Sequence, residues 1–478
     1  MSQTAVQTAA VLGGGVIGGG WAARFLLSGW NVNVFDPDPE AERKLSEVLS
    51  NARRSLPGLY ENDLPEEGRL VFSATLAEAV ADAQWIQESV PERLELKQSV
   101  FADVQAHCVS DAIIASSTSG FKPSQLQEKL SRPEQLIVAH PFNPVYLLPL
   151  IELVGDPNTS ATAANHLRSI GMFPLLVRKE IDAHIADRFL EAVWREGLWL
   201  IKDGIATTQE IDDAIRYGFG LRWAQMGLFE TYRVAGGEAG MAHFIAQFGP
   251  ALEWPWTKLM DVPELTDELV NDIAAQSDAQ SGKHSIRELE RIRDDNLVGI
   301  LRALKQRNWG AGEVLNQQDT RLKRSMGDIK AEPVVTIERA IPVDWTDYNG
   351  HMNESRYGQV FSDAADAIME LIGADQQYIA GGLSYFTVEN RIRYIDEALA
   401  GDRVYVNSQV LLGEGKKLRV LHEMYHRDGR LLATDEQMML HVSLETRKSC
   451  PPDGVVLGNT EKLAKAHSFL PVPEYVIN

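Results

Sequence analysis

The sequence predicts a multidomain chain made of a doubly wound α/β domain at residues 1–182, an all-helical domain at 183–325 and an α+β domain at 326–478. Three observations predict this class. The 478 residues correspond to about three domains of ordinary size. Short apolar runs alternate with helical patterns in the first third, which is typical of a parallel sheet covered by helices. After residue 333 the pattern changes to long runs that alternate between apolar and polar residues, which indicates antiparallel strands.

Composition and charge exclude several classes of protein. The chain is 44% hydrophobic and 24% charged, which is typical of a globular protein. It carries 46 basic against 67 acidic side chains, a net charge of −21, so neither nucleic acid nor an anionic membrane surface is expected as a partner. Cys108 and Cys450 have no metal-binding spacing, so they are expected to be reduced thiols and no metal site is predicted. No basic segment precedes the first apolar run and no run reaches about 18 apolar residues, so a cytoplasmic location is expected.

The first domain begins with a predicted strand at 9–12 that runs into glycines and then into a helical pattern. Strand, glycine turn and helix are the context in which a G-x-G-x-x-G motif binds a dinucleotide. Gly13 permits the tight turn, Gly15 lets the backbone approach a pyrophosphate, and Gly18 allows the helix to pack closely on the strand. The helix N-terminus then offers free N–H groups to the phosphates. The predicted contact residues are Gly13, Gly14, Gly15, Val16, Ile17 and Gly18.

A second strand at 32–35 ends in Asp36, eighteen residues after Gly18. A carboxylate in this place accepts hydrogen bonds from the ribose hydroxyls and repels a 2′-phosphate. The sequence therefore predicts NAD as the cofactor in preference to NADP.

Further strands are predicted at 71–73, 85–90, 112–115 and 136–139, and polar segments at 88–92, 116–120 and 140–144 follow three of them. Ligands in such sheets bind at the carboxyl ends of the strands. His140 has the titration range of a base that removes the proton of an alcohol. Glu152, on the next strand at 149–154, is a candidate to orient the imidazole. On these residues alone, His140 capping a turn and Glu152 lying in solvent remain open alternatives.

Together the glycine motif, the segment 115–119 and the segment 140–145 followed by Glu152 resemble the 3-hydroxyacyl-CoA dehydrogenase superfamily over about residues 8–320. The resemblance implies that His140 is the general base and Glu152 its orienting carboxylate. It also implies that Ser119 hydrogen-bonds the substrate hydroxyl or the nascent ketone. The remaining positions that it transfers are Glu92 and Lys97, near the nicotinamide ribose, and Asn143, in the site motif.

One position departs from that family. Where the family usually has Val-Asn-Arg at the start of the helical domain, this chain has Ala186, Asp187 and Arg188. Asp187 is either an ordinary acid in the first turn of a helix, stabilised by the helix dipole, or the partner of a positively charged substrate.

The helical domain is rich in tryptophan and tyrosine. Such residues most often form a core or a dimer interface, but several aromatic faces can also bind a trimethylammonium group, which donates no hydrogen bond. The segments 211–218, 221–223, 231–237 and 253–256 resemble the L-carnitine 3-dehydrogenases, which implies NAD-dependent oxidation of L-carnitine to 3-dehydrocarnitine. The expected aromatic contacts are Trp223, Tyr232, Trp254 and Trp256. Arg222 or Arg233 is expected to bind the substrate carboxylate, or alternatively to form an ion pair within the fold.

A linker is expected at about 317–332, followed by a strand at 334–341 and an amphipathic helix at 355–372. Four further strands are expected at 384–395, 403–412, 417–426 and 431–444, which gives one helix against a long antiparallel sheet. The helix is expected to bury Tyr357, Phe361, Ala365, Ile368 and Ile372.

Between the first strand and the helix of this domain lie Asp347, Asn349, His351 and Asn353 in the pattern D-x-N-x-H-x-N. Residues 332–450 thereby resemble the hot-dog-fold thioesterases. The resemblance implies that Asp347 is the catalytic carboxylate, as nucleophile or as base for water, and that the following helix N-terminus polarises the thioester carbonyl. Glu389 is a weaker candidate for a second carboxylate. The alternative is a polar turn that caps the helix.

These resemblances predict a bifunctional enzyme, a carnitine dehydrogenase joined to a thioesterase. The fusion suggests that both halves serve one pathway, with betainyl-CoA hydrolysed to betaine and CoA. The alternative is a 3-hydroxyacyl-CoA dehydrogenase fused to an acyl-CoA thioesterase or to a non-catalytic hot-dog dimerisation module. Both component families usually pair subunits, so a homodimer is expected.

Overall fold

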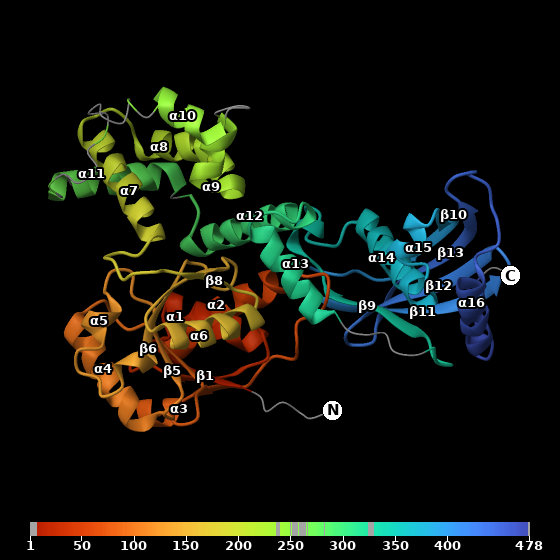
Figure 1. The fold of residues 1–478 in the computed structure, drawn as a ribbon, viewed down its shortest axis with the longest axis horizontal. Helices are drawn as coiled ribbons and strands as arrows, with labels where there is room; N and C mark the ends of the chain where they lie inside the picture. Colours follow the sequence, from red (N-terminus) through yellow and green to blue (C-terminus); the bar gives the residue numbers. More distant parts are fainter. Residues whose placement is uncertain are drawn as a thin grey trace. The chain divides into compact units, whose positions relative to one another are not determined.

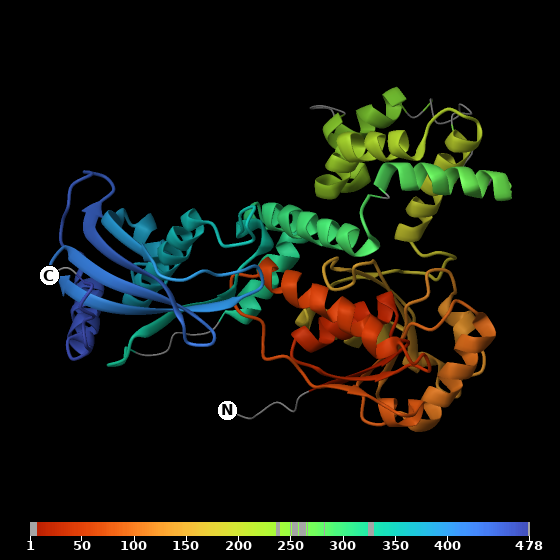
Figure 2. The same cartoon turned by 180° about the vertical axis from the view of Figure 1, so that it is seen from behind.

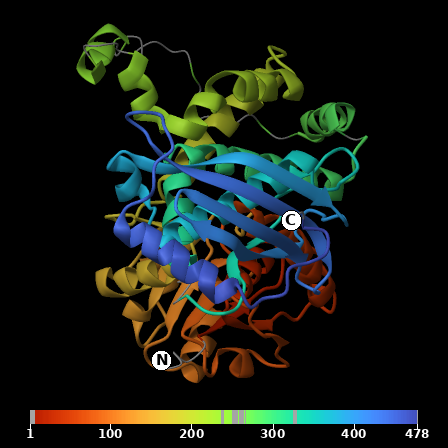
Figure 3. The same ribbon diagram turned by 90° about the vertical axis from the view of Figure 1, so that its right-hand side faces the viewer.

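The computed structural model describes residues 7–235, 240–248, 250, 257, 264, 266–281, 283–323 and 329–476. The chain divides into two compact units. The first consists of Met1–Ala52 and Glu66–Gln318, and the second of Arg53–Pro65 and Asp319–Asn478. Figures 1, 2 and 3 show the elements of each unit from three sides.

The first unit contains an eight-stranded sheet in the order β3-β2-β1-β4-β5-β6-β7-β8. Neighbouring strands are parallel except for β6 and β7, which are antiparallel. The strand order reverses beside β1, and this is the edge at which doubly wound sheets bind nucleotides. The strands are β1 (Thr8–Leu12), β2 (Asn31–Phe35), β3 (Leu70–Phe72), β4 (Trp85–Glu88), β5 (Ile113–Ser116), β6 (Leu136–Pro141), β7 (Leu150–Val154) and β8 (Phe173–Leu176).

Helices connect these strands and cover the sheet (Figure 1). The central strands are apolar because both of their faces are covered. Ala10, Ile86 and Ile114 on three neighbouring strands pack with Phe101 and Val104 of α4 in one buried cluster. The helices are α1 (Val16–Leu27), α2 (Ala41–Ser55), α3 (Leu76–Val80), α4 (Leu94–His107), α5 (Pro123–Leu126) and α6 (Pro157–Ser169).

The second half of the first unit is helical, as expected. Its first helix, α7, buries only Leu198, while Phe189, Leu190 and Trp194 are more than half exposed. The elements are α7 (Ala186–Lys202), α8 (Thr208–Ala214), a π-helical turn (Ile215–Phe219), α9 (Gly220–Ala235), α10 (Gly240–Phe248), α11 (Asp267–Ser281), α12 (Ile286–Gln306) and α13 (Ala311–Leu322), whose last turn from Asp319 onward is counted with the second unit.

The second unit contains a five-stranded antiparallel sheet in the order β10-β13-β12-β11-β9. The long helix α14 (Glu354–Ile372) packs on this sheet through the side chains expected from its pattern, since Tyr357, Phe361, Ala365, Ile368 and Ile372 are all buried. One helix against a long antiparallel sheet is the hot-dog architecture. The strands are β9 (Val334–Ala340), β10 (Leu383–Tyr394), β11 (Arg403–Glu414), β12 (Lys417–His426) and β13 (Leu431–Ser443).

Two further helices complete this unit. α15 (Gln376–Ala380) precedes β10, and α16 (Gly454–His467) packs on β11 and α14. Asp453 caps α16 by accepting hydrogen bonds from the N–H groups of Val455 and Val456.

Residues 53–65, which follow α2 in the chain, are also part of the second unit. The Asp63 carboxylate accepts two hydrogen bonds from the Arg403 guanidinium, at 3.1 and 2.8 Å. Asp63 N–H donates to the carbonyl of Glu338 on β9 at 2.9 Å, and Glu61 pairs with the buried Arg339. This segment is therefore held to the hot-dog sheet by paired charges as well as by a backbone hydrogen bond.

The expected linker at 317–332 begins inside α13, which ends at Leu322. Within the described ranges, no helix is long and apolar enough to cross a membrane. Cys108 and Cys450 are both free thiols.

Candidate active sites

The glycine turn after β1 lies where the backbone must approach other groups closely. Gly13 has a φ of +98°, and a Cβ on it would lie 2.6 Å from the carbonyl oxygen of Ser89. A Cβ on Gly18 would lie 1.8 Å from the carbonyl oxygen of Gly13. A Cβ on Gly15, by contrast, would meet no atom within 4 Å. Gly13 and Gly18 are thus required by packing, whereas Gly15 leaves open space at the start of α1, where a pyrophosphate fits.

Beside this turn lies a groove of about 820 Å³ that is lined by Gly13, Gly14, Gly15 and Asp36 among others. Asp36 ends β2, and its carboxylate accepts hydrogen bonds from the N–H of Gly14 at 2.5 Å and of Asp38 at 2.8 Å. The carboxylate is therefore fixed at the edge of the groove, where ribose hydroxyls need an acceptor. Glycine turn, open helix end and fixed carboxylate together fit NAD.

Replacing Asp36 by alanine is expected to raise the KM for NAD about ten- to hundredfold, because hydrogen bonds to a charged group contribute about 1.5–3 kcal/mol. The KM for NADP is expected to fall, since the variant no longer repels a 2′-phosphate. Steady-state kinetics with both cofactors measure this. Glu42→Gln, an exposed acid in the first turn of α2, is the control and should change neither KM. Equal weakening of both cofactors by D36A would contradict the assignment.

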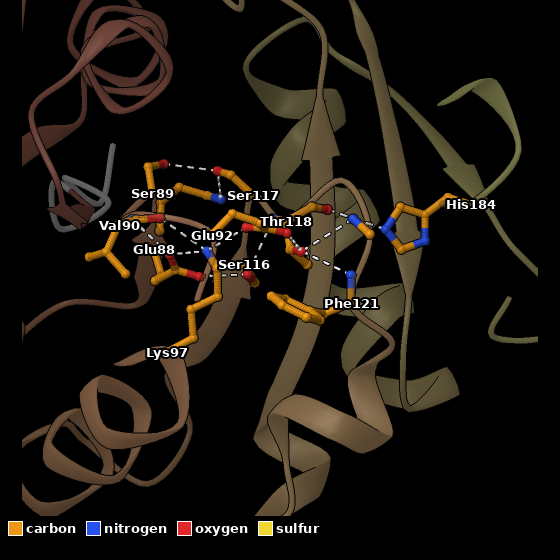
Figure 4. Close-up of polar contacts among 12 residues, drawn as sticks. Glu88, Ser89, Val90, Glu92, Lys97, Ser116, Ser117, Thr118, Phe121 and His184 are labelled. Atoms are coloured by element: carbon orange, nitrogen blue, oxygen red, sulfur yellow. Dashed lines mark hydrogen bonds and ion pairs between the residues drawn. The ribbon is translucent and has the colours of Figure 1, made fainter. Parts of the chain in front are cut away.

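The predicted cofactor residue Lys97 lies in a buried ionic network (Figure 4). Its ammonium contacts Glu88 at 2.6 Å and Glu92 at 3.1 Å. Glu88 also accepts a hydrogen bond from the Ser116 hydroxyl at 2.6 Å and one from the Val90 N–H at 2.7 Å. Burial raises the pKa of Glu88, although Lys97 lowers it. The Glu88 carboxylate thus ties the polar ends of β4 and β5 together through Ser116, and Lys97 supplies its opposite charge.

Glu92 lies at the outer end of this network, and its side chain is half exposed. Its other oxygen accepts a hydrogen bond from the Thr118 hydroxyl. Glu92 is therefore the member of the network that a bound cofactor can reach.

His140 and Glu152 form the expected pair across β6 and β7, where they are direct partners in the antiparallel register. Nδ1 of His140 lies 3.0 Å from a carboxylate oxygen of Glu152. The other oxygen of Glu152 accepts hydrogen bonds from the N–H groups of Ile185 at 2.8 Å and Ala186 at 3.0 Å. Burial raises the pKa of Glu152, but these hydrogen bonds outweigh it and hold the pKa below the ordinary range. An ionised Glu152 fixes the tautomer of His140, with the proton on Nδ1 and the lone pair on Nε2.

Asp187 faces the open side of the same imidazole. One of its carboxylate oxygens lies 3.6 Å from Nε2 of His140, and the side chain is 17% exposed. Burial raises the pKa of Asp187, although the nearby His140 lowers it. The position that departs from the superfamily pattern therefore lies beside the candidate base, next to Nε2 of His140.

Ser119 and Asn143 lie on the loops that follow β5 and β6, and both are exposed. Ser119 follows Thr118 directly in the segment that Figure 4 shows beside Glu92. The peptide bond between Asn143 and Pro144 is cis. The loops thus present both side chains at the end of the sheet that carries His140.

The sequence reasoning did not single out His184, which the structure places in the site. This residue is fully buried, and its ring centroid lies 5.5 Å from that of His140. Its Nε2 lies 3.2 Å from the carbonyl oxygen of Thr118. A histidine two residues from a helix start carries no signal that distinguishes it from a surface residue.

The expected aromatic residues of the helical part are only partly described. Trp223 packs on Phe219 with ring centroids 4.7 Å apart, and Tyr232 stacks on Phe244 at 4.6 Å. Arg222 is exposed on α9. These ring contacts lie within the helical part and do not include His140. Trp254, Trp256 and the side chain of Arg233 lie outside the described residues.

The second candidate site is the loop between β9 and α14. Asp347 accepts hydrogen bonds on one carboxylate oxygen from the N–H groups of Asn349 at 2.8 Å and His351 at 3.3 Å. Thr346 and Met352 pair as an antiparallel bridge, so the loop is a tight turn. Asn353 is the N-cap of α14 and accepts a hydrogen bond from the Ser355 N–H at 3.0 Å.

Both parts of this motif therefore have a structural role as well as a candidate catalytic one. Asn353 caps the helix, as the alternative interpretation expected, and Asp347 stabilises the turn with one of its oxygens. Nε2 of His351 lies 3.5 Å from Glu397, and its side chain is partly exposed. Glu389 is exposed at a bulge in β10.

Comparison with protein families gives matches for three segments of the chain. Residues 8–181 match the 3-hydroxyacyl-CoA dehydrogenase NAD binding domain, and residues 184–272 match the C-terminal domain of the same family. Residues 341–460 match the thioesterase-like superfamily. The two units thus correspond to a dehydrogenase that binds NAD and to a thioesterase-like domain.

Two relatives match this chain over 98% of its length, and a third matches 63% of it. A protein of Ruegeria pomeroyi called L-carnitine dehydrogenase/betainyl-CoA thioesterase is 65% identical over 98% of both chains. A protein of Rhizobium meliloti with the same name is 49% identical over 98% of both chains. An L-carnitine dehydrogenase of Pseudomonas putida is 52% identical over 63% of this chain and 95% of its own.

Among solved structures, a 5-formyl-3-hydroxy-2-methylpyridine 4-carboxylic acid 5-dehydrogenase is similar to 63% of this chain and 99% of its own, with 26% identity and a TM-score of 0.53. It supports the dehydrogenase fold of the first unit. The match to the two-function relatives covers both units. The chain belongs to the family of L-carnitine dehydrogenase/betainyl-CoA thioesterases.

Proposed function

We propose that the first unit oxidises L-carnitine to 3-dehydrocarnitine with NAD. The observation that carries this proposal is the carboxylate of Asp187, 3.6 Å from Nε2 of His140. A negative side chain at this place suits a substrate with a positive charge close to its hydroxyl group. In L-carnitine a single methylene separates the carbinol carbon from the quaternary nitrogen.

His140 is the base of the reaction. Its lone pair on Nε2 takes the proton of the substrate hydroxyl, and Glu152 on Nδ1 stabilises the imidazolium that forms. Ser119 donates a hydrogen bond to the hydroxyl oxygen as it becomes a ketone. NAD, when bound in the groove beside Asp36, supplies the acceptor for the hydride of the carbinol carbon.

Asp187 and the aromatic residues bind the cation in this proposal. The trimethylammonium group accepts no hydrogen bond and donates none, so it is recognised by charge and by aromatic faces. Asp187 supplies the charge, and Trp223, Tyr232, Trp254 and Trp256 are the proposed aromatic faces. Arg222 or Arg233 binds the substrate carboxylate.

Replacing Asp187 by asparagine is expected to raise the KM for L-carnitine about ten- to hundredfold. The attraction between two unit charges about 4 Å apart near a protein surface is about 4 kcal/mol before desolvation is subtracted. The KM for NAD should not change. Measurement of NADH formation at varied L-carnitine and varied NAD separates the two constants.

The matched control is Glu191→Gln, one helical turn further along α7, where the side chain is 42% exposed and lies 3.6 Å from Arg195. This variant should keep the wild-type KM for both substrates. Two results together would show that Asp187 does not bind a cation. The first is an unchanged KM of D187N for L-carnitine, and the second is a rate of D187N with 3-hydroxybutyryl-CoA that does not exceed the wild-type rate.

The second unit hydrolyses betainyl-CoA to betaine and CoA. Three features support a thioesterase site: the N-terminus of α14, the Asp347 carboxylate in the turn before it, and the match of residues 341–460 to thioesterase-like proteins. The helix N-terminus polarises the thioester carbonyl, and Asp347 acts on that carbonyl carbon as nucleophile or through a water molecule.

The substrate of the second unit is tested by CoA release from betainyl-CoA and from a panel of acyl-CoAs of similar size. A preference for betainyl-CoA supports one pathway for both units. A preference for plain acyl chains, together with NADH formation from 3-hydroxybutyryl-CoA instead of L-carnitine, would favour the alternative fusion of an acyl-CoA dehydrogenase and an acyl-CoA thioesterase.

The enzyme acts as a homodimer in the cytoplasm in this proposal. Two apolar surfaces support the pairing: the exposed side of α7, with Phe189 and Trp194, and the edge strand β10, with Phe386 and Val388. Unpaired edge strands and apolar patches are ordinarily covered by a partner. Light scattering of the full chain gives the mass, and a monomeric mass at micromolar concentration would contradict the pairing.

A further inference from the structure

Thr118 is a buried residue between the cofactor side and the substrate side of the dehydrogenase site (Figure 4). It lies two residues after the end of β5 and is 1% exposed. Its hydroxyl, its N–H and its carbonyl are all hydrogen-bonded, and each is bonded to a different part of the chain. A buried residue whose polar groups are all used in this way fixes the relative positions of the segments that it joins.

The hydroxyl of Thr118 joins Glu92 to the turn that carries Ser119. It donates its proton to the Glu92 carboxylate. The same oxygen accepts hydrogen bonds from the N–H groups of Phe121 at 3.0 Å and Gly120 at 3.3 Å. These directions follow from chemistry, because a carboxylate only accepts and a backbone N–H only donates. The turn of Ser119 is therefore closed by the oxygen that also binds Glu92.

The backbone of Thr118 extends these contacts in two directions. Its N–H donates to the Ser116 hydroxyl oxygen at 3.3 Å, and that hydroxyl donates to Glu88 in the buried ionic network. Its carbonyl oxygen lies 3.2 Å from Nε2 of His184, and Nε2 is the donor since a carbonyl only accepts. Thr118 is thus bonded to the ionic network on one side and to the start of the segment 184–187 on the other.

The segment 184–187 holds the partner of the base. Two N–H groups of this segment donate to one oxygen of Glu152 at 2.8 and 3.0 Å. The other oxygen of Glu152 lies 3.0 Å from Nδ1 of His140. The rings of His184 and His140 lie 5.5 Å apart. A displacement of this segment would therefore move the carboxylate that orients His140.

We infer that Thr118 is a positioning residue for hydride transfer, which aligns Ser119 and the segment 184–187 with the cofactor side at Glu92. This inference rests on the proposed roles of His140 as base and of Ser119 as donor to the substrate oxygen. Since Thr118 is buried, it acts through the groups that it holds and not on the reacting atoms. A displacement of about 1 Å at a distance from the chemistry can lower the rate about a hundredfold.

Two substitutions separate the hydroxyl from the rest of the side chain. Thr118→Val has nearly the same shape but lacks the hydroxyl, so the bond to Glu92 and the closure of the Ser119 turn are lost. Thr118→Ser keeps the hydroxyl and lacks only the methyl group. The measured quantity is kcat for L-carnitine per NADH-binding site, with the sites counted by fluorescence titration. Unfolded protein binds no NADH, so loss of folded protein does not change this quantity.

In T118V, kcat per NADH-binding site is expected to fall about ten- to hundredfold. The isotope effect with L-carnitine that carries deuterium at the carbinol carbon should be at least as large as in the wild type, because hydride transfer is the step that slows. The dissociation constant of NADH should stay near the wild-type value, and T118S should retain most of the wild-type kcat. Thr162→Val is the control and should change none of these quantities, since Thr162 is exposed on α6 and its hydroxyl bonds the Asn158 carbonyl at 3.1 Å.

A wild-type kcat in T118V overturns the inference. An equal loss in T118S and T118V also overturns it, because the effect would then follow the methyl group. A smaller isotope effect in T118V would assign the loss to a step other than hydride transfer, and NADH binding weakened as much as kcat would assign it to the cofactor; either result excludes the positioning role. A wild-type enzyme that does not oxidise L-carnitine overturns the proposed function itself, which is a distinct result.

Discussion

Replacing His140 by glutamine is expected to lower kcat for NAD-dependent oxidation by about two to four orders of magnitude, because a positioned general base contributes about that much. The glutamine amide has no basic lone pair to replace Nε2. The packing around this position is expected to survive. It consists of the Glu152 carboxylate, 3.0 Å from Nδ1 of His140, and of the Phe142 ring, whose centroid lies 4.9 Å from that of the imidazole in an edge-on arrangement. Pre-steady-state and steady-state formation of NADH give the change in the chemical step.

Measurement of NADH binding distinguishes loss of the general base from disruption of the whole site. H140Q should bind NADH with the wild-type dissociation constant, because the glycine turn follows β1 and Asp36 follows β2, whereas His140 lies on β6, three positions from β1 in the sheet. His166→Gln, in α6, is the control and should keep full activity. A kcat within tenfold of the wild type in H140Q would show that His140 is not the base.

Replacing Asp347 by asparagine is expected to lower the rate of thioester hydrolysis by about two orders of magnitude or more, whether the carboxylate attacks the carbonyl or activates water. The asparagine oxygen can still accept the hydrogen bonds of Asn349 and His351 that stabilise the turn. The variant therefore removes the charge and keeps the loop. CoA release from betainyl-CoA measures the loss, and NADH formation in the same preparation should be unaffected.

Asp344→Asn is the matched control for this variant. Asp344 lies three residues earlier, is exposed, and is in the short helical turn Val343–Trp345. It should keep the rate of hydrolysis. Full hydrolysis by D347N would leave the turn as a helix cap without a catalytic role, and the second unit would then be a non-catalytic module.

The fold could be predicted largely from the sequence because its strands carry clear patterns. The buried runs of β1 and β4 are continuous, as in a parallel sheet, and the face of α14 that contacts the sheet repeats with helical spacing. The pairing of residues 53–65 with the second unit could not be predicted, because Asp63 and Arg403 are 340 residues apart and nothing local connects them.

The sites were predictable where a motif couples spacing to geometry. His140 and Glu152 are twelve residues apart and face each other on antiparallel strands. Asp187 was indicated by its departure from the superfamily pattern. The buried position of His184 was not predicted, since it depends on a contact with the carbonyl of Thr118, which is 66 residues away in the chain. The expected contacts of Trp223 and Tyr232 with substrate stay predictions, because their described ring partners are Phe219 and Phe244.

The segment 53–65 has a consequence for any attempt to express the two activities as separate proteins. The relative from Pseudomonas putida is called L-carnitine dehydrogenase alone and matches 63% of this chain, so the first activity occurs there without the second. In this chain, however, a thioesterase fragment that starts at Asp319 would lack Asp63 and Glu61. Arg403 would then lose the carboxylate that it binds at 2.8 Å, and the buried Arg339 would lose the ion pair with Glu61 while keeping that with Asp363. The two functions occupy different units, but the thioesterase unit consists of two separate segments of the sequence, Arg53–Pro65 and Asp319–Asn478.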